Sequence, residues 1–207
     1  MSRTLMPNNL TSPHVLNLYP SQNSWIFESA AIASYIDLIY TDQPRLHDPS
    51  EGEDGSALEQ ARVKQWSSFA SDYVFNTLEH HLIKPSVTLL QKNKNPNASR
   101  EEQEEVRVLQ KYVQDGYDKS REVLQVIEDH LEKQQQGGGH FLLGKKVSWA
   151  DLYLAPVIAD FHAVSLGRGL LEEFPHLKKW FFEFSKQDCF LKTYPGSLSQ
   201  VLLEAAN

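Results

Sequence analysis

Residues 100–136 carry the longest helical pattern in the chain. Apolar side chains recur there at intervals of three, four or seven residues. Three glycines, residues 137–139, follow and favour the end of a helix. The pattern predicts one long helix over residues 100–136.

Other segments after residue 57 show the same spacing. Apolar residues recur over residues 57–90, where Pro85 is expected to bend or break the helix. A further helix is expected from about Trp149 to Leu166, and Pro175 suits the first turn of another. Residues 57–207 are therefore expected to form an all-helical domain.

The N-terminal part has a different pattern. "PHVLNLY" (residues 13–19) and "WIF" (residues 25–27) read as strands, and the short turn "PSQNS" between them allows an antiparallel pair. From Glu28 onward the spacing becomes helical. The fold class predicted for the whole chain is α+β and mostly α.

A linker is predicted between these two parts. Residues 47–56, "HDPSEGEDGS", contain a proline, two glycines and four acidic residues. The expected division is residues 1–46 and residues 57–207.

Composition excludes several classes of partner. The net charge of −7 argues against binding to nucleic acid or to an anionic membrane. The single cysteine, Cys189, cannot form an internal disulfide, which fits a reducing compartment, and we expect it to be a packed thiol. The start of the chain lacks the apolar core of a secretory signal, so a cytoplasmic protein is expected. No Cys/His metal pattern is evident, and no metal is expected.

A helix-start signal lies at "VSWADL", residues 147–152. Ser148 can accept a hydrogen bond from the N–H of Asp151, and the Asp151 carboxylate can reach back to the Ser148 N–H. Val147 and Leu152 can form the accompanying apolar contact. This pattern is structural, because it needs no ligand.

A second helix start, at Glu28 and Ser29, allows two interpretations. The pair can cap the helix that follows. Alternatively, the free N–H groups and partial positive charge of a helix start can bind a small charged ligand.

Three segments together resemble the glutathione S-transferase (GST) superfamily. They are "ESAAIASYID" (residues 28–37), "FLLGKKVSWADLYLAPVIADF" (residues 141–161) and "FPHLKKWFFEFSKQDCFLKTYP" (residues 174–195). The similarity covers roughly residues 13–195. It implies a truncated thioredoxin-like N-terminal portion in residues 1–46 and an all-helical GST C-terminal domain in residues 57–207.

The resemblance also implies a glutathione site. Glu28 and Ser29 match the pair that binds the γ-glutamyl part of glutathione. Ser12 and Pro13 match the residue before the family's cis-proline and the proline itself, although a trans proline in a plain loop is the alternative. Only twelve residues precede Pro13, whereas the family places a β-α-β-α segment with its thiol-activating residue there. The catalytic residue is therefore unknown.

The function implied is a glutathione-dependent transferase or cis-trans isomerase acting on a small electrophilic metabolite, in the manner of fungal enzymes of secondary-metabolite biosynthesis. The family places this substrate in an apolar cleft, here assigned to Trp66, Phe69 and Tyr73, and usually forms homodimers. An aromatic stripe at helical spacing also fits a packed core. The alternative from another class is a noncatalytic interaction module, like those of translation elongation factor gamma subunits or tRNA-synthetase complexes.

Overall fold

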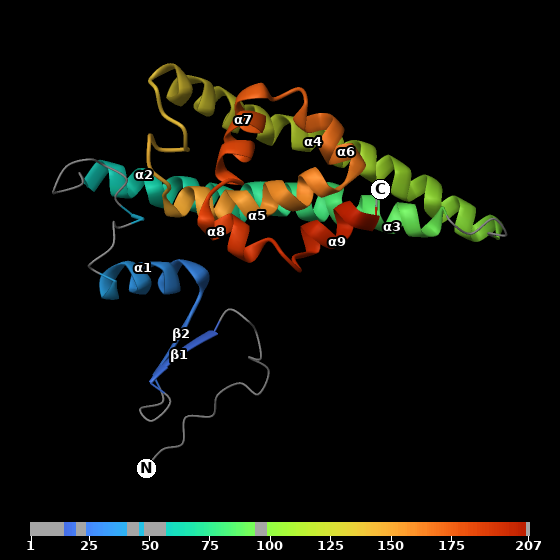
Figure 1. The fold of residues 1–207 in the computed structure, drawn as a ribbon. Coiled ribbons are helices and arrows are strands. Elements are labelled where there is room, and N and C mark those ends of the chain that lie inside the picture. Colours follow the sequence, from blue (N-terminus) through green and yellow to red (C-terminus); the bar gives the residue numbers. More distant parts are fainter. Residues whose placement is uncertain (1–14, 20–23, 41–45, 48–56, 94–98, 206–207) are drawn as a thin grey trace, which may run out of the picture.

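The structure is a computed structural model that describes residues 15–19, 24–40, 46–47, 57–93 and 99–205. Two strands and one helix lie below a group of packed helices (Figure 1). In chain order the elements are β1 (Val15–Tyr19), β2 (Ser24–Phe27), α1 (Ser29–Ile39), α2 (Ala57–Ser68), the π-helical η2 (Phe69–Val74) and η3 (Asn76–Ile83), α3 (Lys84–Lys92), α4 (Arg100–Gln136), α5 (Trp149–Ala163), α6 (Ser165–Leu171), α7 (Pro175–Phe184), α8 (Asp188–Thr193) and α9 (Leu198–Ala205).

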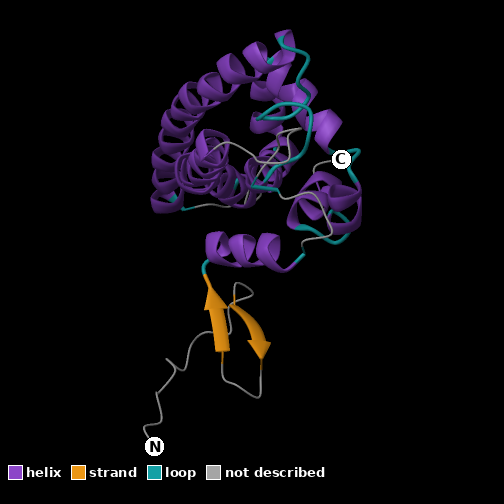
Figure 2. Cartoon of the chain, turned by 90° about the vertical axis from the view of Figure 1, so that its left-hand side faces the viewer, coloured by secondary structure: helices purple, strands orange, loops and turns teal. Residues whose placement is uncertain are grey.

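The two strands pair as predicted. β1 and β2 are antiparallel, and Val15 at the start of β1 lies opposite Phe27 at the end of β2. Both views place α1 between this hairpin and the helices above it (Figures 1 and 2). The hairpin and α1 therefore bring the start of α1 beside the first residue of β1.

The first long helical segment runs from α2 to α3 and is not interrupted at Pro85. Its winding changes from π to α at Lys84 instead. Pro85 has no N–H to donate to the carbonyl of His81, four residues earlier. Gly116 of α4 lies against that carbonyl, and a Cβ added to Gly116 would stand 1.9 Å from the His81 oxygen. A glycine is thus required where α4 and η3 cross.

Helix α4 has the predicted limits. It begins after Ser99, whose Oγ accepts the Glu102 N–H at 3.2 Å while the Glu102 carboxylate accepts the Ser99 N–H at 2.6 Å. It ends at Gln136, before Gly137. Hydrogen bonds within one turn at each end fix these limits, which is why the local sequence predicts them.

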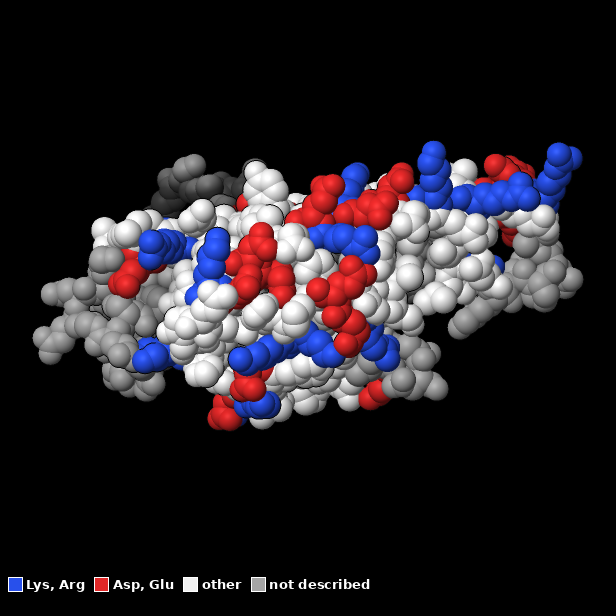
Figure 3. All heavy atoms as spheres, turned by 90° about the horizontal axis from the view of Figure 1, so that it is seen from above, with Lys and Arg blue, Asp and Glu red and all other residues white. Residues whose placement is uncertain are grey.

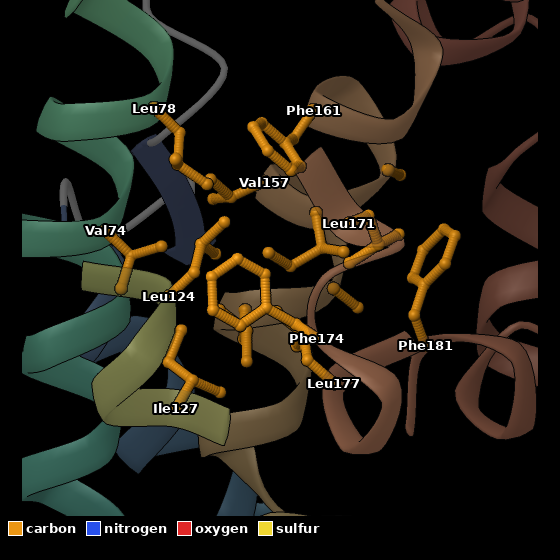
Figure 4. Packing of buried hydrophobic residues seen from close by; sticks show 14 of the residues in the cluster. Val74, Leu78, Leu124, Ile127, Val157, Phe161, Leu171, Phe174, Leu177 and Phe181 are labelled. Atoms are coloured by element: carbon orange, nitrogen blue, oxygen red, sulfur yellow. The ribbon is translucent and has the colours of Figure 1, made fainter. Parts of the chain in front are cut away.

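Helix α5 forms the centre of the helical part. It is buried along most of its length and packs against α2, η2, η3, α6, α7 and α9. Figure 4 shows its Val157 and Phe161 close to Leu78 of η3, Leu124 of α4 and Phe174, the residue before α7. One apolar core therefore joins the described helices on both sides of α5.

The prediction of one helix from Trp149 to Leu166 is wrong at its end. The helix stops at Ala163, and Val164 is extended, with φ −88° and ψ 142°. Helix α6 then leaves at an angle of 114° to α5. A Cβ on Gly167 would lie 2.0 Å from the Phe161 carbonyl oxygen. This close return of the chain is a tertiary contact that helical spacing does not reveal.

The face formed by α4 and α7 carries charges of both signs. Lys and Arg side chains lie among Asp and Glu side chains over this face, without a separate basic patch (Figure 3). Among the described helices, none is by itself both long enough and apolar enough to cross a membrane. α5 and α6 meet those two criteria only as a sharply bent pair.

Candidate functional site

The junction between β2 and α1 is formed by Glu28, whose backbone is unusual. Its φ is 71° and its ψ is 123°, and among described non-glycine residues it alone has a positive φ. The Glu28 carbonyl accepts the N–H of Ile32 at 3.0 Å, which starts the helix. Such strained backbone is concentrated at functional sites, because surrounding structure must maintain it.

The side chains of Glu28 and Ser29 do not cap the first turn of α1. The Glu28 side chain makes no capping hydrogen bond, and both residues are exposed. The Ser29 hydroxyl has no hydrogen bond to a described residue. The first N–H groups of a helix have no partner within the helix. An anion can therefore reach the N–H groups of the first turn of α1, together with one hydroxyl and one carboxylate.

Ser12 and Pro13 lie outside the described residues, so their assignment stays a prediction. The register of the hairpin places the beginning of β1, at Val15, opposite Phe27, next to Glu28 in the chain.

The three aromatic residues of the predicted stripe differ in exposure. Trp66 and Phe69 are half-buried against the core, with their rings edge to face at 5.5 Å. Tyr73 stacks on Phe69 at 5.8 Å but is 68% exposed. Trp66 borders a polar cavity with residues of α2 and α4. The structure thus places two of these rings on the core and the third at the surface.

An apolar cavity of about 440 Å³ lies between α5, α8 and α9, and sequence patterns do not reveal it. Its wall includes Trp149, Leu152, Ala159, Phe184, Phe190 and Tyr194. It forms because segments far apart in the chain meet there.

The prediction that Cys189 is a packed thiol is wrong, because the side chain is exposed and borders this cavity. Helix α8 is only six residues long and has no buried residue.

Asp151 is a buried carboxylate at the start of α5. It accepts hydrogen bonds from the Ser148 N–H and the Leu142 N–H, each at 2.9 Å, and from the Ser148 hydroxyl at 2.8 Å. The indole N–H of Trp180 in α7 is a fourth donor, also at 2.9 Å. Burial raises the pKa of Asp151, and these donors oppose that rise. The predicted helix-start signal is therefore also a joint between α5, α7 and the preceding loop.

A second buried carboxylate, Asp37, joins α1 to the segment that follows it. Asp37 accepts the N–H groups of Leu46 and His47 at 3.3 and 2.8 Å. The His47 ring lies 6.1 Å from the Trp149 ring, and the Leu46 carbonyl accepts the Trp149 N–H at 3.1 Å. This chain of contacts connects α1 to α5.

The sequence is similar to that of known proteins over most of its length. Residues 110–181, which include the Asp151 joint, match the family model described as the glutathione S-transferase C-terminal domain. Glutathione S-transferase F13 of Arabidopsis thaliana is 27% identical over 175 residues, which is 83% of this chain and 68% of that protein. Both matches support the GST superfamily as the family of this chain.

Solved structures show the same GST fold. The poplar glutathione transferase F1 is 24% identical, with a TM-score of 0.52 over 89% of this chain and 72% of that one. The tau-class transferase of mango, Mangifera indica, is 17% identical, with a TM-score of 0.60 over 89% and 71%. A transferase family member of Pseudomonas fluorescens Pf-5, with bound S-(propanoic acid)-glutathione, is 18% identical, with a TM-score of 0.54 over 93% and 83%. The chain therefore has the mostly helical α+β fold that its sequence predicts, with an all-helical GST-type C-terminal domain.

Proposed function

We propose that this protein is a glutathione-dependent transferase or cis-trans isomerase that acts on a small electrophilic metabolite, such as an intermediate of secondary metabolism. Residues 1–46 would form its glutathione-binding portion and residues 57–207 its helical domain. The observation that carries the proposal is the start of α1, where Glu28 has a φ of 71° and neither the Glu28 nor the Ser29 side chain makes a capping hydrogen bond to a described residue. The GST relatives support the same class of activity.

The groups at the start of α1 fit the γ-glutamyl end of glutathione. Its carboxylate would accept hydrogen bonds from the Ser29 hydroxyl and from the first-turn N–H groups, where the helix dipole favours negative charge. Its ammonium group would pair with the Glu28 carboxylate. When bound, glutathione supplies a thiol nucleophile for an electrophilic carbon.

The second substrate would occupy an apolar surface. The stripe of Trp66, Phe69 and Tyr73 stays the predicted wall, and its exposed member is Tyr73. The apolar cavity between α5, α8 and α9 is a second candidate, because about 440 Å³ suits a small molecule. Tyr73→Ala and Phe190→Ala separate them: the substitution at the true site raises the KM for the electrophile, and the other leaves it unchanged.

Isothermal titration calorimetry with glutathione tests the proposed site. We expect wild type to bind and Ser29→Ala to bind about tenfold more weakly, because one hydrogen bond to a charged group is lost. Ser34→Ala is the matched control, since Ser34 lies in the same helix and its hydroxyl donates to the Ala30 carbonyl at 3.0 Å. Binding that survives both Ser29→Ala and Glu28→Gln would place glutathione elsewhere.

A wild-type protein that does not bind glutathione would overturn the proposal and favour the noncatalytic interaction module. We also propose a cytoplasmic homodimer, by analogy with GSTs. Light scattering tests the oligomeric state, and a monomer at all concentrations would contradict it.

A further inference from the structure

The polar cavity beside Trp66 has a lining unlike that of the apolar cavity between α5, α8 and α9. It measures about 480 Å³ and is lined by one face of α2 from Glu59 to Trp66, by the last part of α4, and by Leu143 in the loop before α5. Figure 1 shows α2, the C-terminal end of α4 and this loop at the same end of the molecule. The volume lies within the range of small-molecule sites.

A flat aromatic pair borders the cavity. The rings of Trp66 and His130 lie 4.1 Å apart at 34°, and Phe69 supports Trp66 from the side. The His130 Nε2 lies 2.6 Å from the Leu142 carbonyl oxygen, so Nε2 carries the hydrogen and donates it. Burial lowers the pKa of His130, so the ring is neutral near pH 7. Packing and this hydrogen bond therefore hold the two uncharged rings, of Trp66 and His130, in place at one side of the cavity.

Three polar side chains around these two rings, those of Arg62, Gln65 and Gln134, make no hydrogen bond or ion pair to a residue that the structure describes. Within the described part of the chain, the Arg62 guanidinium has neither an ion pair nor a hydrogen bond. By contrast, Arg107 pairs with Glu104 and Arg121 pairs with Glu173. The side-chain amides of Gln65 and Gln134 likewise make no hydrogen bond to described residues.

These groups define a class of ligand. A guanidinium binds carboxylates well, because its donors form a planar fork. Trp66 is half-buried and offers a flat apolar surface to an aromatic ring. Glu59, on the same wall, would repel a second negative group.

We propose that this cavity binds a small aromatic monocarboxylate, with the carboxylate on Arg62 and the ring against Trp66 and His130. The side-chain amides of Gln65 and Gln134 supply further hydrogen bonds to polar substituents. The site is independent of the proposed glutathione site at Glu28 and Ser29.

Calorimetry with 2-naphthoate tests the proposal, and 2-naphthalenemethanol serves as a neutral probe of the same shape. We expect naphthoate to bind wild type, the alcohol to bind at least tenfold more weakly, and Arg62→Gln to lose about tenfold in naphthoate affinity. Arg107→Gln is the matched control, because Arg107 lies on α4 about 35 Å along the helix from His130. It should bind naphthoate as wild type does.

Two further measurements locate the ligand. Naphthoate should shift the His130 ring resonances in the NMR spectrum, identified by their loss in His130→Asn. Saturating glutathione should leave the naphthoate affinity unchanged, and a protein that does not bind glutathione should still bind naphthoate. The proposal is overturned if wild type does not bind naphthoate, if Arg62→Gln binds it equally, or if glutathione displaces it.

Discussion

Asp37 Oδ2 lies 2.5 Å from His47 Nδ1, and this pair connects α1 to the segment that leads toward the helical domain. The same carboxylate also accepts the backbone N–H groups of Leu46 and His47. The His47 ring in turn lies against Trp149 at the start of α5. One buried carboxylate therefore holds the chain between the proposed glutathione-binding portion and the core helix.

Replacing this carboxylate should loosen the connection. Asp37→Ala leaves two backbone N–H groups without their acceptor, which we expect to lower the free energy of unfolding by about 1–3 kcal/mol. Urea denaturation measures the loss, and hydrogen exchange at the Leu46 and His47 amides should become faster. Asp72→Ala, at an exposed residue of η2, is the control. Unchanged exchange at both amides in Asp37→Ala would contradict this role.

The Asp151 joint should depend on the indole N–H of Trp180. Trp180→Phe keeps an aromatic ring but removes one of four donors to the carboxylate, so we expect a loss of about 1–3 kcal/mol in urea denaturation. Trp149→Phe is the control, because the buried Trp149 Nε1 has no hydrogen-bond partner among the described residues. It should cost less than Trp180→Phe. Equal losses would show that ring size, not the hydrogen bond, accounts for the effect.

The crossing of α4 and η3 should not tolerate a methyl group. Gly116→Ala places a Cβ 1.9 Å from the His81 carbonyl oxygen, so the two helices must separate. We expect a loss of about 1–3 kcal/mol in the free energy of unfolding. Gly169→Ala is the matched control in α6, where a Cβ meets nothing within 4 Å, and it should stabilise the helix by up to about 1 kcal/mol. Two variants of equal stability would refute the close crossing.

His130 should contribute a pH dependence of known sign. Burial lowers its folded-state pKa, whereas the unfolded ring takes up a proton near its ordinary value of about 6.5. The unfolded state then binds more protons, so the free energy of unfolding falls as the pH falls through about 6.5. His130→Asn should flatten this part of the stability curve.

Urea denaturation between about pH 8 and pH 5 provides the measurement. The difference in stability between wild type and His130→Asn should shrink toward acid pH. Burial also lowers the pKa of His162, so part of the slope should remain in the variant. A difference that stays constant with pH would exclude the contribution of His130.

Helix limits were predictable where short-range hydrogen bonds set them. Ser99 and Glu102 begin α4, Gly137 follows its end, and Ser148 with Asp151 begins α5. All of these contacts lie within about one helical turn, so neighbouring residues in the sequence contain the information. The pair at Glu28 and Ser29 was visible for the same reason, because it stands where the spacing changes from strand to helix.

The sequence alone therefore determined the strand pair, the starts of α1, α4 and α5, and the resemblance to the GST superfamily. Only the tertiary structure decided that Asp151 also binds Trp180, 29 residues away, that Cys189 is exposed, and that Tyr73 is at the surface while Phe69 packs inward. It also created both cavities. The physical reason is that burial and side-chain pairing depend on which distant segments cover a helix. The spacing of apolar residues along the sequence does not show which segments those are.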